Sequence, residues 1–273
     1  LSWFSSFRSW LLWDKQRSDP VFTKLDYIKL KVKTIELKSK QTVTPNDNNV
    51  TTFRRIRKSI GILGISLPVV LILFSMIPVF KTSVQPSISH YYYTNLRELF
   101  TGVLCAVGLF LFNYKGHSNT NFLKNDSKLT NIAGSMAFGI ALMPTNPEAC
   151  TYKIYSLLPF CNVELGWLHY IFAGIFFLTL SVISINVFTI GQIENKKIPK
   201  SIMNENNIYR TCGYLMLLFI VLTPVCASFD CFTYSTLIFE SLMLFAFGIS
   251  WLIKGRILGD KGAIGEKLYQ ETN

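Results

Sequence analysis

The sequence is poor in charged residues, and acidic residues are the scarcer kind. Only 16% of its 273 residues are charged, against about 25% in soluble domains of ordinary composition. Half of the residues are hydrophobic, and the mean hydropathy is +0.33. The composition therefore disfavours a soluble globular protein and favours one that is embedded in a lipid bilayer.

The motifs of common enzymes and metal sites are also missing. The cysteines form no Cys-x-x-Cys pair and lie near no pair of histidines, so we expect no metal site. No glycine-rich phosphate loop, Walker sequence or nucleophile elbow occurs, and we expect no cofactor. These absences disfavour the ordinary enzyme classes and leave open an unusual membrane hydrolase.

What the chain does contain is a series of six apolar segments. Each approaches the roughly 20 residues that a helix needs to cross a hydrocarbon core, although the second and third need flanking residues to complete a span. The segments predict an all-α, polytopic membrane protein, with six transmembrane helices in a bundle. The predicted spans are residues 60–80, 99–113, 129–143, 166–190, 212–227 and 232–253.

Lysine and arginine are distributed unevenly between the two sides of these spans. Twenty-four of the 27 lie in the terminal segments and in the connections on the same side, and only Lys81, Arg97 and Lys153 lie on the other side. Basic residues accumulate on the cytoplasmic side of membrane proteins, so both termini are predicted to be cytoplasmic. The net charge of +11 is therefore expected to set orientation, and no nucleic acid partner is predicted.

The predicted domains are a basic cytoplasmic or interfacial arm (1–52), a six-helix transmembrane domain (53–256) and a cytoplasmic tail (257–273). Within the arm, residues 1–13 have the spacing of an amphipathic helix, which would lie in the membrane interface or pack on the bundle. Residues 27–37 alternate apolar and charged side chains, which is typical of a strand. We expect residues 1–50 to bind anionic lipids or a membrane protein partner. Residues 41–52 are predicted to be a linker.

Proline and small residues predict features of individual spans. Pro68 and Pro78 are expected to kink the first span, and Pro224 the fifth. In the third span, small residues recur at intervals of four, which lets helix backbones approach closely. That span is therefore predicted to be central in the bundle, through Ala133, Ala137, Ala141 and the nearby glycines Gly134 and Gly139.

Glu240 is the most informative polar residue, because it lies deep inside the sixth apolar segment. A carboxyl group at that depth marks either a functional site or a structural hydrogen bond between helices. His169 is a ligand, a base or simply an interfacial histidine, and Arg97 is a candidate counter-charge for Glu240 or Glu98. Seven polar residues share the outer half of the predicted bundle and are expected to line a polar, ligand-binding cavity: Ser89, His90, Tyr91, Arg97, Glu98, His169 and Glu240.

Tyr91 and its two neighbouring tyrosines also fit an aromatic belt at the membrane interface. Four cysteines flank outer connections, where an oxidising compartment would permit disulfides. The favoured pairs among three possible arrangements are Cys150 with Cys161 and Cys226 with Cys231.

Several runs together resemble a family of bacterial multispan proteins of unknown function, and more remotely the six-span DRAM-type membrane proteins. The runs are Ser-Ile-Ser-His-Tyr-Tyr-Tyr-Thr, Leu-Cys-Ala-Val-Gly-Leu-Phe-Leu-Phe and Tyr-Lys-Gly within residues 87–116, then 141–144, His169 with 172–177, 209–213, and Glu240 with 247–254. The likeness covers about residues 55–256 and implies six spans in a bacterial inner membrane. It implies no activity.

These observations predict a multi-pass inner-membrane protein that binds a lipid head group, a small polar ligand or a membrane partner through the outer-half cavity. One alternative is an accessory subunit of a larger membrane assembly, docked through its basic arm. Another is an intramembrane hydrolase or transferase acting on lipids, with Glu240 or His169 as the base.

Overall fold

The computed structural model describes residues 47–114, 116, 119–146, 166–190, 204–229, 231–259 and 268. Chain contacts divide the protein into two units, residues 1–50 and 51–273, and the side chains considered below all belong to the second. The helix predicted at 1–13, the strand predicted at 27–37 and the pair Cys150 and Cys161 lie outside the described residues.

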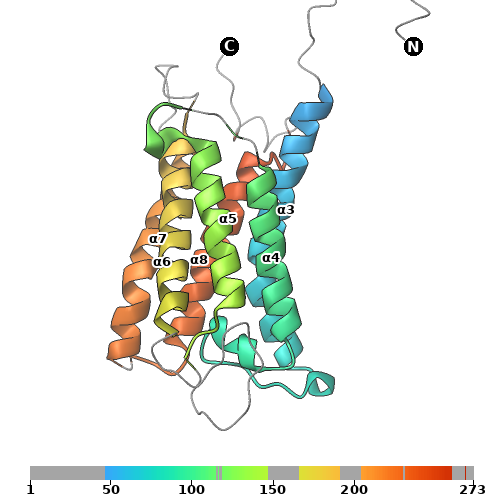
Figure 1. Cartoon of the computed structure of the whole chain (residues 1–273), viewed down its shortest axis with the longest axis vertical. Helices are drawn as coiled ribbons and strands as arrows, with labels where there is room; N and C mark the ends of the chain where they lie inside the picture. Colours follow the sequence, from blue (N-terminus) through green and yellow to red (C-terminus); the bar gives the residue numbers. More distant parts are fainter. Residues whose placement is uncertain are drawn as a thin grey trace, which may run out of the picture. The chain divides into compact units, whose positions relative to one another are not determined.

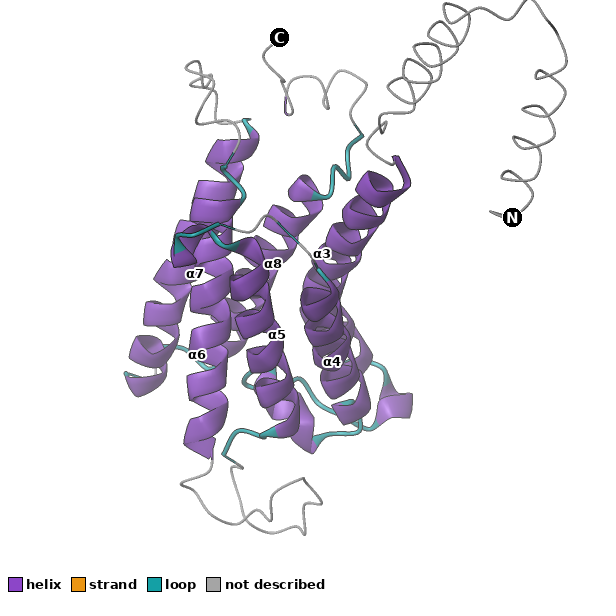
Figure 2. Cartoon of the chain, turned by 45° about the horizontal axis from the view of Figure 1, so that its top comes forward, coloured by secondary structure: helices purple, strands orange, loops and turns teal. Residues whose placement is uncertain are grey.

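The regular structure of the described residues is helical throughout (Figure 2). Each of the six predicted segments overlaps one helix, so the all-α prediction is confirmed for the described residues. The helices are α3 (Asp47–Ser75), α4 (Arg97–Asn113), α5 (Asp126–Leu142), α6 (Gly166–Val182), α7 (Glu205–Ser228) and α8 (Ser235–Lys254). Helix α6 continues as the π-helix η5 (Ile183–Val187), and three short 3₁₀ helices lie in connections: η1 (Pro78–Phe80), η2 (Ser89–Tyr93) and η3 (Phe122–Lys124).

Four of these helices are long and apolar enough to cross a membrane: Thr51–Ser75, Gly166–Val187, Glu205–Ser228 and Ser235–Lys254. Helices α4 and α5 are shorter, with 17 residues each. At about 1.5 Å per residue, 17 residues extend about 26 Å, which is less than the roughly 30 Å of a typical hydrocarbon core.

Successive helices alternate in direction, as Figure 1 shows for α3 to α8. The beginning of α3 and the end of α8 therefore lie at the same end of the bundle, which we call the inner end, and the opposite end is the outer end. Of the 11 lysines and arginines with described side chains, only Lys81 and Arg97 lie at the outer end. The nine at the inner end are Arg54, Arg55, Arg57, Lys58, Lys124, Lys128, Arg210, Lys254 and Arg256.

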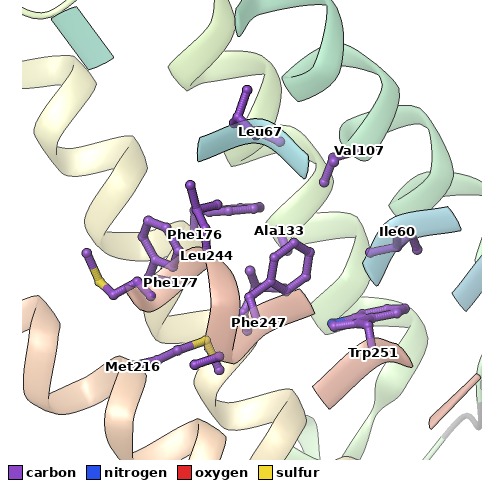
Figure 3. Packing of buried hydrophobic residues seen from close by; sticks show 14 of the residues in the cluster. Ile60, Leu67, Val107, Ala133, Phe176, Phe177, Met216, Leu244, Phe247 and Trp251 are labelled. Atoms are coloured by element: carbon purple, nitrogen blue, oxygen red, sulfur yellow. The ribbon is translucent and has the colours of Figure 1, made fainter. Parts of the chain in front are cut away.

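The third predicted span packs closely on its neighbours, as its small residues predicted. Helix α5 contacts both α4 and α6, and its three alanines at four-residue spacing are buried. Gly134 of α5 faces Gly108 of α4 so closely that a Cβ atom on Gly134 would lie 3.0 Å from the Gly108 carbonyl oxygen. Side chains of α6 and α8 fill the interior beside this pair of helices, and Figure 3 shows Phe176 and Leu244 among them.

The first predicted span differs from the structure at both ends. Helix α3 begins at Asp47, inside the segment that was predicted to be a linker, because extending an existing helix adds one hydrogen bond per ordered residue. It ends at Ser75, so the predicted kink at Pro78 is wrong. Pro78 instead opens η1, a position where a helix needs no backbone N–H donor. Pro68 and Pro224 do lie inside helices, α3 and α7.

Candidate ligand-binding site

The carboxyl group of Glu240 is bound by the main chain of the outer connection between α3 and α4. The Ile88 N–H donates to Glu240 Oε2 at 2.7 Å, and the Ser89 amide also interacts with this carboxyl group. Next to it, the Leu237 N–H in the first turn of α8 donates to the Pro86 carbonyl at 3.0 Å. The loop at residues 86–90 is therefore fixed to α8 through main-chain groups.

His169 fixes the same loop to α6. Its Nε2 lies 2.8 Å from Ser89 Oγ, and its Nδ1 lies 2.6 Å from the Met143 carbonyl oxygen after α5. Its side chain is buried, and both of its ring nitrogens have hydrogen-bond partners in the protein, as buried polar groups usually do. The predicted convergence of Ser89, His169 and Glu240 thus occurs, with Ser89 between the other two.

His90 lies in the same loop but bonds locally. Its Nδ1 lies 2.6 Å from Ser87 Oγ, and its main-chain N–H donates to that same oxygen at 3.1 Å. Ser87 therefore acts chiefly as the cap of the turn that leads into η2, a common role for serine.

A cavity of about 700 Å³ lies next to this loop. Its volume falls in the range of about 300–1,000 Å³ that is typical of small-molecule sites. The residues that line it come from all six helices and from the loop: Leu67, Pro86, Ser87, Ile88, Ser89, His90, Phe100, Leu104, Ile140, Trp167, Tyr170, Ala173, Gly174, Phe176, Phe177, Ile220, Thr223, Pro224, Ala227, Ser228, Thr236, Glu240, Met243 and Leu244.

The polar groups of this cavity are few. Most of its lining is apolar, and among the described lining residues Glu240 is the one acidic residue and none is lysine or arginine. Within the described part of the chain the Thr236 hydroxyl has no hydrogen-bond partner, so it is available to a ligand. The structure therefore corrects the expected polar cavity to an apolar one with a polar patch at Ser89, Thr236 and Glu240.

Four of the seven predicted site residues do not line the cavity: His169 is buried behind Ser89, and Tyr91, Arg97 and Glu98 have other contacts. Arg97 donates to the Tyr92 hydroxyl at 2.7 Å and stacks over the Tyr92 ring, so the predicted pairing of Arg97 with Glu240 is wrong. Burial raises the pKa of Tyr92, and Arg97 opposes that rise. Tyr91 is buried with its hydroxyl 3.2 Å from Ser75 Oγ, and Glu98 is exposed in the first turn of α4.

Arg97 binds Tyr92 because this neighbour, five residues away, offers it an aromatic face and a hydroxyl, whereas Glu240 is already satisfied by main-chain amides.

Cys226 and Cys231, the second predicted disulfide, are both free thiols in this structure. Their side chains nevertheless interact, and the Cys231 N–H donates to the Cys226 carbonyl at 3.1 Å. Such contact is compatible with reduced cysteines.

Several residues that shape the cavity were not predicted from the sequence, notably Tyr170, Gly174 and Thr236. Gly174 has open space where a side chain would be: a Cβ atom there would meet no atom within 4 Å. Its only signal in the sequence is a glycine among the bulky residues of 171–178. A small residue in such a run also fits close helix packing, so the sequence pattern alone does not distinguish a helix contact from a cavity wall.

A second polar cluster, also unpredicted, lies at the inner end. Arg57 of α3 donates to the Tyr114 hydroxyl at 2.6 and 3.1 Å, and that hydroxyl donates to Asp126 Oδ2 of α5 at 2.8 Å. Tyr114 is buried against Trp251, and burial with the nearby Asp126 raises the pKa of Tyr114. The hydroxyl therefore keeps its proton and remains a donor. This cluster joins α3, α5 and α8 to the end of α4.

Lys254 lies near the same cluster and closes the inner end. Its Nζ donates to the Phe188 carbonyl at 2.7 Å and lies over the rings of Phe188 and Tyr209. Tyr209 in turn donates to Glu205 Oε2 at 3.2 Å. These contacts fix polar residues where helices meet, so we regard the inner cluster as structural.

No protein-family model, curated protein or solved structure matches this chain. The resemblance to bacterial multispan proteins therefore stays a prediction.

Proposed function

We propose that the protein is a six-span membrane protein that binds a neutral or cationic amphiphile in the outer cavity. The observation that carries this proposal is the cavity itself, in which apolar walls from every helix meet a polar patch at the loop of residues 86–90. A bacterial inner membrane as its location follows from the sequence resemblance alone. Docking of a partner protein through residues 1–50 also remains a proposal.

Six spans are supported by the arrangement of the helices. Helices α4 and α5 are short, yet they pack between helices that are long enough to cross a membrane, and they alternate in direction with them. A short helix surrounded by protein crosses a bilayer more easily than one that is exposed to lipid. The basic residues of the inner end support a cytoplasmic position for that end.

Cysteine labelling tests the number of spans and their direction. In a variant without the native cysteines, Lys81→Cys should react with a membrane-impermeant maleimide on intact cells, and Lys124→Cys should react only after permeabilisation. Both lysines are exposed, so accessibility to water is matched. If only four helices cross and α4 and α5 do not, the connection that contains Lys124 stays on the outer side. Both positions will then react on intact cells. Labelling of Lys124→Cys alone would reverse the orientation.

The chemistry of the lining indicates the class of ligand. An apolar cavity wall favours a hydrocarbon chain, whereas the hydroxyls and the Glu240 carboxyl favour a head group that donates hydrogen bonds. With no described lysine or arginine in the lining, an anionic head group has no counter-charge. A desolvated anion next to a carboxyl group is unfavourable, so neutral or cationic amphiphiles are expected to bind best.

Filling the cavity tests this assignment directly. Gly174→Leu places a side chain into open space beside the cavity, and should weaken capture of a diazirine-bearing monoacylglycerol at least 10-fold because the apolar volume is lost. The measurement is photocrosslinking of the purified full chain in lipid nanodiscs, as a function of probe concentration. A tenfold change corresponds to about 1.4 kcal/mol of binding free energy.

Gly102→Leu is the matched control, because Gly102 also has no atom within 4 Å of a built Cβ but does not line the cavity. It should bind the probe as the unaltered protein does. Competition should be stronger for monoacylglycerol than for the free fatty acid of equal chain length. Equal capture by Gly174→Leu and the unaltered protein would refute binding in this cavity.

A further inference from the structure

We propose that Ser89 and His169 form a nucleophile and base pair that cleaves the ester of an acyl amphiphile held in the outer cavity. This inference rests on the proposed function, because the cavity must first bind the amphiphile. It adds a reaction, acyl transfer to a serine and then to water, and a substrate class, neutral acyl esters such as monoacylglycerols.

The geometry is that of an activated serine. Ser89 Oγ lies 2.8 Å from His169 Nε2, which is within the hydrogen-bond reach required of a general base. The other ring nitrogen, Nδ1, lies 2.6 Å from the Met143 carbonyl oxygen. A nucleophile, a base and a third group that orients the base therefore lie in sequence, although they come from a loop, from α6 and from the end of α5.

The Met143 carbonyl also determines which ring nitrogen of His169 carries the proton. A carbonyl oxygen only accepts hydrogen bonds, so the short contact with Met143 requires a proton on Nδ1. In neutral His169, Nε2 is then unprotonated and must accept the hydrogen bond from the Ser89 hydroxyl. This is the tautomer that removes a proton from serine, and the fold alone selects it.

The Ser89 hydroxyl is not needed to fix its loop. The loop is already bound to α8 through the Pro86 carbonyl, the Ile88 N–H and the interaction of the Ser89 amide with Glu240. The side chain of Ser89 lines the cavity, whereas His169 lies behind it and is 1% exposed. A hydroxyl at the cavity wall with its base protected from water is an arrangement suited to attack on a bound ligand.

The reaction balances without a cofactor. Ser89 Oγ attacks the carbonyl carbon of the ester while His169 Nε2 takes the hydroxyl proton, and a bond forms between oxygen and the acyl carbon. The bond from that carbon to the alcohol oxygen then breaks, and the alcohol leaves with the proton from Nε2. Water, activated by the same nitrogen, attacks the acyl-serine, which releases a fatty acid and restores the serine.

Glu240 has a positioning role in this scheme. It accepts from the main-chain N–H of Ile88 and interacts with that of Ser89, and so it fixes the direction of the serine toward His169. No oxidant, reductant or second substrate besides water is involved.

Covalent capture and hydrolysis test the proposal on the full chain in lipid nanodiscs. A fluorophosphonate with a dodecyl chain should form a phosphorus–oxygen bond at Ser89, located by peptide mass mapping, with loss of fluoride. The chain should also release fatty acid from monoacylglycerol. His169→Gln should lower both rates at least about 100-fold, the usual contribution of a general base. Thr179→Val, which alters a buried hydroxyl of the same helix outside the cavity, should leave both rates unchanged.

The possible results separate the two proposals. If the diazirine monoacylglycerol binds but the unaltered protein is neither modified at Ser89 nor hydrolytic, the reaction is refuted and ligand binding stands. If Ser89 is modified in a manner that depends on His169, while Gly174→Leu does not weaken capture of monoacylglycerol, the nucleophile stands and the proposed cavity function fails. Labelling that persists in His169→Gln overturns the role of this histidine as base.

Discussion

A leucine in place of Gly248 should prevent α3 from packing on α8 and lower the free energy of unfolding by about 3 kcal/mol. A Cβ atom at this position would lie 2.7 Å from the Gly61 carbonyl oxygen and 2.5 Å from a side-chain carbon of Ile65. The first neighbour is backbone, which cannot rotate away. The two helices must therefore separate, and contacts along their whole crossing are lost.

The measurement is the midpoint of thermal unfolding of the purified protein in detergent, followed by size-exclusion chromatography. Gly102→Leu serves again as control, since the same side chain on α4 meets open space. We expect the unfolding midpoint of Gly102→Leu to stay near that of the unaltered protein, and that of Gly248→Leu to fall by several degrees or the chain to aggregate. Equal midpoints for the two variants would mean that the close crossing of α3 and α8 contributes little to stability.

The sequence predicted the helices better than it predicted which helices pack against each other. The alanines of α5 recur within one segment, so their pattern is local and correctly indicates a closely packed, buried helix face. Gly61 and Gly248, in contrast, each stand alone in an apolar run and form a close contact only because the first and last described helices are adjacent. Periodicity within one segment carries no information about pairing between segments that are nearly 190 residues apart.

In the candidate site, too, individual residues were predicted better than their partners. Glu240 and His169 were recognised because a polar side chain in an apolar run needs a partner, and this argument requires no tertiary structure. The partners themselves were not predicted. Glu240 binds main-chain N–H groups, which every residue except proline carries, so no side-chain pattern in the sequence reveals them. Arg97 contacts the Tyr92 ring instead of a carboxylate.

The convergence of Ser89 with His169 was predicted only as membership of one half of the bundle. A hydrogen bond between residues 80 positions apart depends on how the loop at 86–90 folds back between α6 and α8, and loop paths are not encoded by hydrophobic period. The apolar character of the cavity was missed for a related reason. In the sequence, residues such as Phe176 and Leu244 have the pattern of ordinary core residues. Only the structure shows that they line a cavity.

Replacing Tyr114 with phenylalanine should destabilise the inner end by about 3 kcal/mol, because one hydroxyl there serves three hydrogen bonds with charged groups. Two come from Arg57 and one goes to Asp126, and the ring packs edge-on against Trp251. Phenylalanine keeps the ring and its packing, so the change isolates the hydroxyl. The unfolding midpoint is again the measurement, and Tyr214→Phe is the control, since Tyr214 is exposed on α7.

A double-mutant cycle decides whether the hydroxyl acts as a relay between the two charged residues. Asp126→Asn removes the charge at one end of the relay and keeps the shape of the side chain, and Tyr114→Phe removes the middle. If Tyr114 transmits the attraction between Arg57 and Asp126, the double variant should lose clearly less stability than the two single losses added together. Strict additivity would mean that the Tyr114 hydroxyl and the Asp126 charge are not coupled. The hydroxyl would then stabilise the inner end independently of Asp126, and its role as a relay would be refuted.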